Sequence, residues 1–308
     1  MQGERPQTED HMARMSGRRW ASRARDYLML TKPVVVALLL VTTLSGMIVG
    51  RGGWPGGSLV ALTLLAGALT AGGASALNQY IDRERDAAMQ RTRRRPLPDG
   101  RLQPIQVLVF GFVLSAAGLL LYALGVNLIS AGLALCGWLY YVVLYSLVLK
   151  HTTWQNISVG GGAGAIPPMV GWAAATGGLT IGAVFLFAIV FFWTPPHFWA
   201  LAMLRSRDYA RAGVPMLPVV HGEGETRSQI LLYTVQLVAL TMLLPLAGLG
   251  GWLYIVAAML LGAGLGAHAW RLWRRGGNRN AYHMYRFSSM YLALIFGALV
   301  LDTLRLAA

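Results

Sequence analysis

Long stretches without a charged side chain recur along this 308-residue chain and constrain its fold more than any other feature. A helix needs about 20 apolar residues to cross the hydrocarbon of a bilayer. Only 12% of the residues are charged and the mean hydropathy is +0.52, which is too apolar for a soluble protein of this length. The pattern predicts an all-α membrane protein, a bundle around a central cavity with nine transmembrane helices near residues 28–50, 58–78, 104–125, 128–149, 154–174, 180–204, 229–249, 251–270 and 285–305.

Positive charges are distributed unevenly between the two sides of these predicted helices. The formal net charge is +14, and every Lys and Arg except Arg51 and Arg305 lies before the first span, near its start, or around alternate loops. By the positive-inside rule, this places the N-terminus in the cytoplasm and the C-terminus outside. The distribution accounts for the basic balance without a nucleic-acid partner. We expect a multi-pass protein of the inner (plasma) membrane whose active site faces the cytoplasm.

The N-terminal segment differs in character from the rest. Residues 1–26 are polar, mix both charge signs and lack the apolar core of a cleavable signal peptide, so we expect a mobile cytoplasmic tail. Residues 27–308 are expected to form a single transmembrane domain. The one cysteine, Cys136, lies inside a predicted helix and has no partner for an intramolecular disulfide.

Acidic side chains gather in two cytoplasmic loops, and the first loop begins with a regular pattern. Asn78, Asp82 and Asp86 are four residues apart, which puts them on one face of a helix continued from the second span. An amide and two carboxylates offer the hard oxygen ligands that Mg²⁺ takes, while water or phosphate completes its shell. The spacing therefore predicts a Mg²⁺ site at the membrane surface.

Cationic side chains follow this acidic face directly, in a run that includes Arg91 and Arg95. Guanidinium groups bind phosphate oxygens in bidentate fashion, so metal ligands and arginines together favour a diphosphate. The alternative is a solvated loop whose arginines set the topology and touch anionic lipid headgroups.

The second cytoplasmic loop, RSRDYARAGVPMLPVV, carries a smaller set of similar groups. Asp208 is its carboxylate near a helix end, and Arg205 and Tyr209 lie beside it. We expect the two loops to face each other over a cavity in the bundle. His151, at the cytoplasmic entry to the fifth span, is a candidate for substrate contact, although topology and lipid contact explain it equally well.

Proline pairs interrupt the fifth and sixth predicted spans, at Pro167–Pro168 and inside the segment FFWTPPHFWALA. Because proline breaks or kinks a helix, we expect two broken helices beside a central cavity. His197 follows the second pair, with Trp193 four residues before it. A histidine at membrane depth is costly unless it is paired or functional, and the alternative role is a structural bond to a freed carbonyl.

Five motifs in the same order resemble one known family. The pattern NxxxDxxxD at 78–86, followed by MxRTxxRPLPxG at 89–100, resembles the UbiA superfamily of intramembrane prenyltransferases. The branch that attaches a farnesyl group to heme is the most similar, through LTKPVV at 30–35, NISVGGGAGAIPPMVGW at 156–172, WTPPHFWALA at 193–202 and DYARAGVPMLPVV at 208–220.

This resemblance implies a nine-helix enzyme that transfers farnesyl from farnesyl diphosphate to the 2-vinyl group of heme b, with water addition, to give heme O. It assigns Mg²⁺ binding and catalysis to Asn78, Asp82, Asp86 and Asp208, although Ala212 stands where the wider superfamily often has a second carboxylate after Asp208. The substrate-binding candidates are Arg91, Arg95, Arg205, Tyr209, Trp193, His197 and His151, and His197 ranks ahead of His151 for positioning heme.

Three rival functions have distinct signatures. Another superfamily member, with a quinone precursor or chlorophyllide as acceptor, shares the first acidic motif. A small-molecule transporter places its charged site near the midplane of the membrane, whereas these acids lie at the cytoplasmic end. A structural subunit does not account for the carboxylate spacing. The expected partners are heme b, farnesyl diphosphate and membrane lipids, with a heme A synthase or oxidase assembly factor as the protein candidate.

Overall fold

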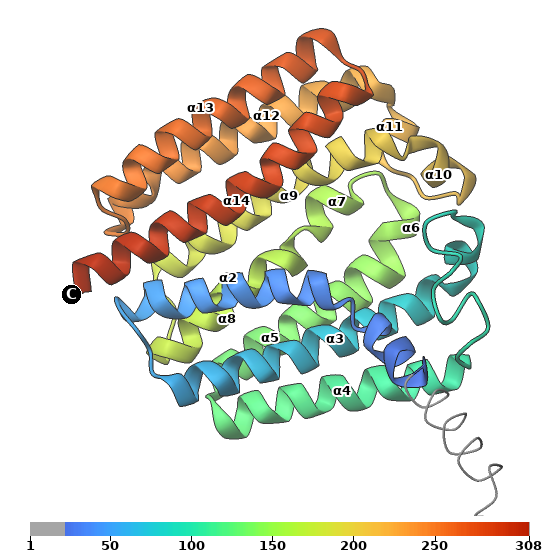
Figure 1. Cartoon of the computed structure of the whole chain (residues 1–308), viewed down its shortest axis with the longest axis horizontal. Helices are drawn as coiled ribbons and strands as arrows, with labels where there is room; N and C mark the ends of the chain where they lie inside the picture. The colour runs from blue at the N-terminus through green and yellow to red at the C-terminus, as the bar shows by residue number, and fades with distance from the viewer. Residues whose placement is uncertain (1–21, 308) are drawn as a thin grey trace, which may run out of the picture.

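The computed structural model describes residues 22–307, and this range is helical with no β-strand. Its longer helices are α2 (Pro33–Arg51), α3 (Gly57–Ala88), α4 (Pro104–Gly125), α5 (Leu128–Leu139), α8 (Gly162–Thr176), α9 (Ile181–Leu204), α12 (Gly222–Leu243), α13 (Trp252–Arg275) and α14 (Asn278–Ala307). Figure 1 shows α12, α13 and α14 together along one side of the molecule, α3 and α4 along the other, and α2 between α14 and α3. Shorter elements join them, namely the π-helix η1 (Tyr140–Leu149), α6 (Lys150–Thr152), α7 (Asn156–Gly160), α10 (Ser206–Arg211), α11 (Leu217–Val220) and the 3-10 helix η2 (Leu244–Ala247).

Eight helical stretches within residues 22–307 are long and apolar enough to cross a bilayer. Large apolar side chains such as Leu124 and Leu246 lie more than 80% exposed on the outside of the bundle, as a surrounding of lipid allows. The chain is therefore an all-α, multi-pass membrane protein, as the hydropathy pattern predicts. The predicted number of nine spans is not reached by this criterion. The fifth span is divided between α7, with 5 residues, and α8, with 15 residues, and neither is long enough by itself.

The division of the fifth span falls at three consecutive glycines. Helix α7 ends at Gly160 and α8 begins at Gly162. A Cβ added at Gly160 would overlap the ring of Tyr145, and one at Gly162 would lie 2.8 Å from the ring of Tyr140. The glycines thus allow two tyrosines of η1 to pack directly on the backbone where the helix is interrupted.

The prediction that the proline pairs break their helices is wrong. Helix α8 continues through Pro167 and Pro168, and α9 continues through Pro195 and Pro196. Each proline removes an intrahelical hydrogen bond, but neighbouring helices and side-chain hydroxyls compensate for such losses inside a membrane bundle.

Close backbone contact joins α2 to α8 next to one of these proline pairs. A Cβ added at Gly46 would overlap the carbonyl oxygen of Pro168, and one at Gly171 would overlap that of Thr43. Small residues allow membrane helices to approach closely and gain dispersion energy without a hydrophobic driving force. Gly46 and Gly171 therefore set the distance between these two helices.

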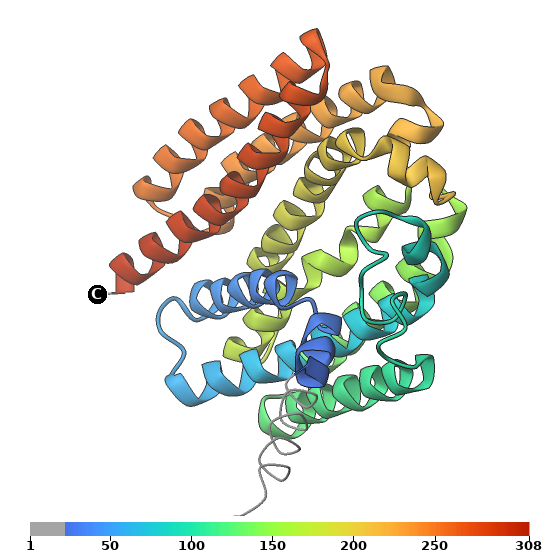
Figure 2. The same ribbon diagram turned by 45° about the vertical axis from the view of Figure 1, so that its right-hand side comes forward.

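The two predicted cytoplasmic loops lie at the same end of the bundle. The loop after α3 lies beside α6 and α10 in both Figure 1 and Figure 2, while the C-terminal end of α14 lies at the opposite end. Residues 22–30 are also helical, and the buried Asp26 forms an ion pair there with Arg101 of the loop. Residues 22–26 of the expected tail are thus helical, whereas residues 1–21 lie outside the described part of the chain.

Candidate active site

The acidic pattern of the first motif lies on the last three turns of α3. Asn78, Asp82 and Asp86 are all buried, with exposures of 2%, 1% and 4%. The amide nitrogen of Asn78 donates to Oδ2 of Asp82 at 2.9 Å and to Oγ of Ser146 on η1 at 3.0 Å. The three polar side chains therefore face the protein interior from one side of α3, whereas Glu84 points outward and is 86% exposed.

Two neighbouring residues of α6 hold the carboxylate of Asp82. Lys150 forms an ion pair with Oδ2, and Nε2 of His151 lies 3.2 Å from Oδ1. The π-helix η1 ends at Leu149, directly before these two residues, and π-helical turns are frequent at functional sites. His151 was a candidate from sequence, but Lys150 was not. Lys150 lies at the end of a predicted span, directly before His151, and this position was the feature of the sequence that could have indicated its role.

The carboxylate of Asp86 pairs with Arg95 across the loop that follows α3. The hydroxyl of Thr92 donates to the backbone oxygen of Asp86 at 2.9 Å and so folds the loop back over the helix end. Arg91, four residues before Arg95, is exposed, and no ion pair of its guanidinium occurs among residues 22–307. Of the two predicted diphosphate ligands, only Arg95 contacts the acidic face.

A third cation, Lys32, reaches this face from the start of α2. Its Nζ donates to Oδ1 of Asn78 at 2.9 Å. Burial of the ammonium, followed by the positive charges of Arg95 and Lys150, lowers the pKa of Lys32 to about 7, even though other atoms of the residue keep some exposed surface. Lys32 belongs to the motif LTKPVV, but its role does not follow from the sequence, because its contact with Asn78 spans 46 residues.

The backbone of Lys32 is strained. Its φ of 49° makes it the sole non-glycine residue with positive φ among residues 22–307. The left-handed conformation costs about 1–2 kcal/mol for a residue with a side chain. Such strain persists where surrounding contacts enforce it, often at functional sites, and here it accompanies the contact between Lys32 and Asn78.

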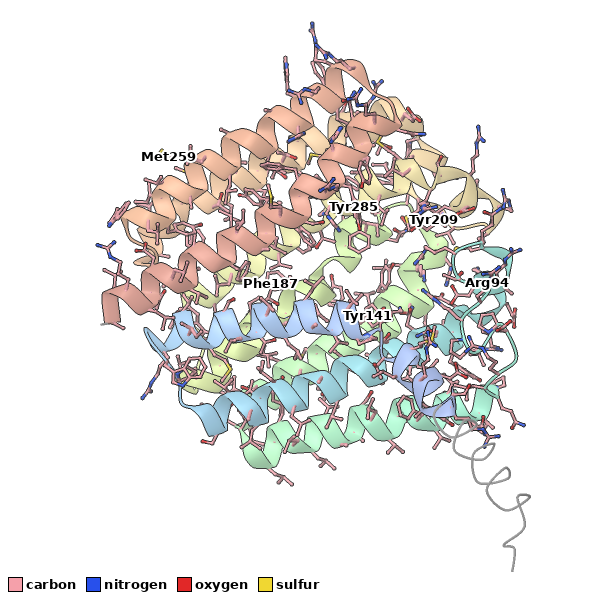
Figure 3. The ribbon with its side chains drawn as sticks, in the orientation of Figure 1. Arg94, Tyr141, Phe187, Tyr209, Met259 and Tyr285 are labelled. Carbon is pink, nitrogen blue, oxygen red and sulfur yellow. The ribbon has the colours of Figure 1, made fainter. Side chains whose placement is uncertain are left out.

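The second loop contributes less to this cluster. Asp208 lies on α10 with its side chain 20% exposed, and its Oδ1 is 3.8 Å from the guanidinium of Arg211. Tyr209, which is labelled in Figure 3, packs against the main apolar core. Within the described range, neither Asp208 nor Arg205 has a hydrogen bond or ion pair to the acidic face of α3.

Trp193 and His197 lie together between α9 and α14. Their rings stack with centroids 4.3 Å apart. Nε1 of Trp193 donates to the backbone oxygen of Ser288 at 2.7 Å, and Nδ1 of His197 lies 2.9 Å from Oγ of Ser288. Tyr285, labelled in Figure 3, places its ring 4.7 Å from that of His197. The alternative role predicted for His197 is a bond to a carbonyl freed by proline. In the structure its Nδ1 contacts the hydroxyl of Ser288 instead.

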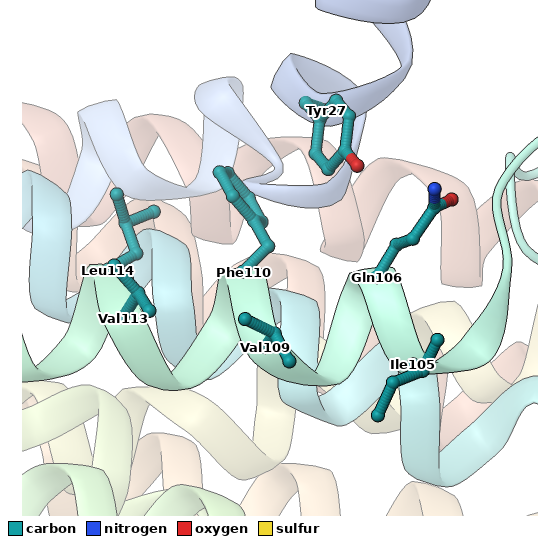
Figure 4. A pocket seen from close by; sticks show the side chains of 7 residues that line it. All are labelled: Tyr27, Ile105, Gln106, Val109, Phe110, Val113 and Leu114. Atoms are coloured by element: carbon teal, nitrogen blue, oxygen red, sulfur yellow. The ribbon is translucent and has the colours of Figure 1, made fainter.

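An apolar groove of about 550 Å³ lies outside this cluster, between residues 22–30 and α4. Figure 4 shows Tyr27 above Phe110, Gln106 and Leu114 of α4. The groove is lined almost entirely by carbon and includes none of the predicted site residues.

The acidic face fits the donor chemistry of a magnesium site in part. Asn78, Asp82 and Asp86 bring one amide and two carboxylates to a common side of α3, and such oxygen donors suit Mg²⁺. No group of three or more His, Cys, Asp and Glu side chains with metal-binding geometry occurs in residues 22–307. These three side chains would make up part of a coordination shell, and Mg²⁺ ordinarily takes its remaining ligands from water and substrate phosphates.

Residues 39–295 match the sequence profile of the UbiA prenyltransferase family. The chain belongs to this family. The match includes the acidic face of α3, the loops that follow α3 and α9, and His197 of α9.

Two UbiA-family relatives illustrate the likeness in sequence. A protein named Protoheme IX farnesyltransferase from Chloroflexus aurantiacus is 48% identical over 285 residues, which is 92% of this chain and 49% of that protein. A protein of the same name from Symbiobacterium thermophilum is 49% identical over 283 residues, 91% of this chain and 95% of that protein. The chain thus spans about half the length of the first relative and nearly all of the second.

Two solved structures share the fold of this chain. A digeranylgeranylglyceryl phosphate synthase superposes with a TM-score of 0.79 at 16% identity, covering 92% of this chain and 99% of that one. A UbiA homologue from Archaeoglobus fulgidus, described as bound to DMAPP and Mg²⁺, gives 0.67 at 17% identity, with 89% and 99% covered. At these identities the likeness concerns the arrangement of helices.

Proposed function

We propose that the chain transfers a farnesyl group from farnesyl diphosphate to the 2-vinyl group of heme b and adds water, giving heme O. Relatives 48% and 49% identical over more than nine-tenths of the chain carry the name Protoheme IX farnesyltransferase. One of them is matched along 95% of its own length, so the proposal does not depend on the additional half of the longer relative.

One structural observation carries the proposal. The buried acidic face of Asn78, Asp82 and Asp86 is surrounded by the ammonium groups of Lys32 and Lys150 and the guanidinium of Arg95. Anionic oxygen ligands and fixed cations side by side suit a metal diphosphate, in which a divalent cation and a polyanion are bound together. A neutral or purely apolar substrate would not need both.

Asn78, Asp82 and Asp86 would hold Mg²⁺, which when bound supplies positive charge against the diphosphate oxygens. A UbiA homologue described as bound to DMAPP and Mg²⁺ supports this use of the metal. The family resemblance adds Asp208 to this set, and we propose that its carboxylate joins the metal site from α10 once substrate is bound.

The cations stabilise charge that develops as the diphosphate leaves. The bond between C1 of the farnesyl chain and its diphosphate oxygen breaks, and the electron pair stays on that oxygen. Lys32, Lys150 and Arg95 lie beside the acidic face and can donate charge-assisted hydrogen bonds to the departing group. Arg91, Arg205 and Tyr209 are proposed to bind the outer oxygens from the two loops.

The allylic cation left behind needs a dry surrounding with aromatic faces. The terminal carbon of the heme vinyl group attacks C1 of the farnesyl chain, and a new carbon–carbon bond forms. Positive charge moves to the vinyl carbon next to the porphyrin ring, water adds there, and the added water releases a proton to solvent. Trp193 and His197 are the proposed contacts with heme.

The cellular setting is part of the same proposal. The basic loops lie at the end of the bundle that carries the acidic face, and by the positive-inside rule this supports a cytoplasmic position for that face, in the inner membrane. Residues 27–308 would act as one catalytic domain. The product would pass to a heme-modifying enzyme or to an oxidase assembly factor.

Membranes that contain the chain test the proposal when they are incubated with heme b, farnesyl diphosphate and Mg²⁺. We expect a product whose mass equals that of heme b plus a farnesyl group and a hydroxyl group, because the added water has lost one proton. Membranes without the chain are the control. Absence of this product, or prenylation of an aromatic quinone precursor supplied in parallel instead of heme, would overturn the assignment.

A further inference from the structure

Ser288 of α14 anchors both polar side chains of the aromatic cluster on α9. Its backbone oxygen accepts from Nε1 of Trp193, and its hydroxyl lies 2.9 Å from Nδ1 of His197. Three rings surround the imidazole, those of Trp193 at 4.3 Å, Tyr285 at 4.7 Å and Phe198 at 5.4 Å between centroids. His197 keeps 9% exposure and is therefore enclosed but not sealed.

The single proton of the Ser288 hydroxyl determines which tautomer His197 adopts. The hydroxyl of Ser288 donates its single proton to the backbone oxygen of Tyr285 at 2.8 Å. Toward Nδ1 of His197 it can then act only as an acceptor, so Nδ1 carries the proton and donates it. Nε2 is left with its lone pair, and no hydrogen bond to Nε2 occurs among residues 22–307.

The other candidate histidine is arranged in the opposite way. Nε2 of His151 is engaged by Asp82 at 3.2 Å, and its Nδ1 is buried without a partner within the described range. Neither nitrogen of His151 is open to a large planar ligand. A neutral imidazole with one nitrogen donating to an oxygen and the other unoccupied is the usual state of a metal-binding histidine.

We propose that Nε2 of His197 coordinates the iron of the heme substrate, and that Ser288 is a positioning residue that holds the ring in the tautomer and orientation this requires. The proposal deepens the function proposed above, since it assumes that heme is the acceptor. It also gives a reason for the aromatic cluster, because ring stacking restricts rotation of the imidazole and so fixes the direction of the Fe–N bond.

Resonance Raman spectroscopy of the ferrous heme complex tests both parts with the full chain in lipid nanodiscs. The wild-type protein should show an iron–histidine stretching band. His197→Ala should lose this band, and added imidazole should restore an axial ligand. Iron-free protoporphyrin IX should still bind to His197→Ala, which verifies that the variant is folded. Retention of the band in His197→Ala would overturn the ligand assignment.

Ser288→Ala tests the positioning role. Without the acceptor at Nδ1 the imidazole loses electron density, so the iron–histidine band should shift to lower frequency and heme affinity should fall by about 10-fold. Ser289→Ala is the matched control, because Ser289 also donates to Tyr285 O, at 3.1 Å, but is exposed and does not bond to His197. A band frequency in Ser288→Ala equal to that of wild type would overturn the role of Ser288.

The two proposals fail separately. If the wild-type chain makes heme O but its iron–histidine band survives in His197→Ala, the farnesyl transfer stands and the ligand assignment is wrong. If the band disappears as expected but no heme O forms, heme is bound through His197 and the proposed reaction is wrong.

Discussion

Nζ of Lys32 donates a hydrogen bond of 2.9 Å to Oδ1 of Asn78, and so ties the start of α2 to the acidic face of α3. Replacing Lys32 by Met keeps the length of the side chain but removes its donor and its charge. A hydrogen bond to a charged group contributes about 1.5–3 kcal/mol, so we expect the KM for farnesyl diphosphate to rise by about 10-fold or more. Arg51→Met, at the other end of α2, is the control and should leave KM unchanged.

Asp82 and Glu84 provide a second matched pair. Asp82 is 1% exposed and pairs with Lys150, whereas the side chain of Glu84 is 86% exposed. We expect Asp82→Asn to lower kcat by about 100-fold or more, because it removes charge that organises the diphosphate site. Glu84→Gln should keep kcat within about 2-fold. Equal losses in the two variants, measured by heme O formation, would argue against a special role for the buried face.

Metal binding should depend on the diphosphate. The acidic face supplies two carboxylates and an amide, and no group of three or more acidic, His or Cys ligands occurs in residues 22–307. We expect weak Mg²⁺ binding to the chain alone and at least about 10-fold tighter binding when inorganic diphosphate is present. Calorimetric titration measures both affinities. Chelation should abolish product formation and added Mg²⁺ should restore it. Activity that persists in excess chelator would contradict the metal requirement.

The crossing of α2 and α8 should tolerate no added methyl group. A Cβ at Gly171 would overlap the carbonyl oxygen of Thr43, whereas a Cβ at Gly164 of the same helix meets nothing within 4 Å. We expect Gly171→Ala to lower the free energy of unfolding by about 1–3 kcal/mol. Gly164→Ala should leave it unchanged or slightly higher, since Ala favours helix more than Gly does. Unfolding in mixed detergent micelles compares the two.

Much of the fold follows from local pattern. Uncharged stretches of sufficient length predict the membrane helices, and the four-residue spacing of Asn78, Asp82 and Asp86 predicts their common face, since both depend only on helix geometry. The fifth span shows where local pattern fails. Its prolines predict a break, but tertiary packing keeps α8 continuous through them and the interruption falls at Gly161.

The partners of the site residues could not be predicted in the same way. Lys32, Lys150 and Ser288 reach Asn78, Asp82 and His197 across 46, 68 and 91 residues of sequence. A single lysine or serine near a span end has many possible roles, and only the packing of helices decides which one it has. For Arg91 the motif position predicts a diphosphate contact, and this stays a prediction, because the side chain is exposed and has no ion pair within residues 22–307.

The pairing of Asp82 with Lys150 and of Asp86 with Arg95 has a consequence for how substrate arrives. Each carboxylate is already matched by a cation and Lys32 adds a further positive charge, so the acidic face offers no uncompensated negative charge to a free divalent ion. Free Mg²⁺ should therefore gain little from long-range attraction to this face. Binding would instead require an exchange of partners at close range. Metal and diphosphate would enter together, the metal would bind the carboxylates, and the diphosphate would bind Lys150 and Arg95.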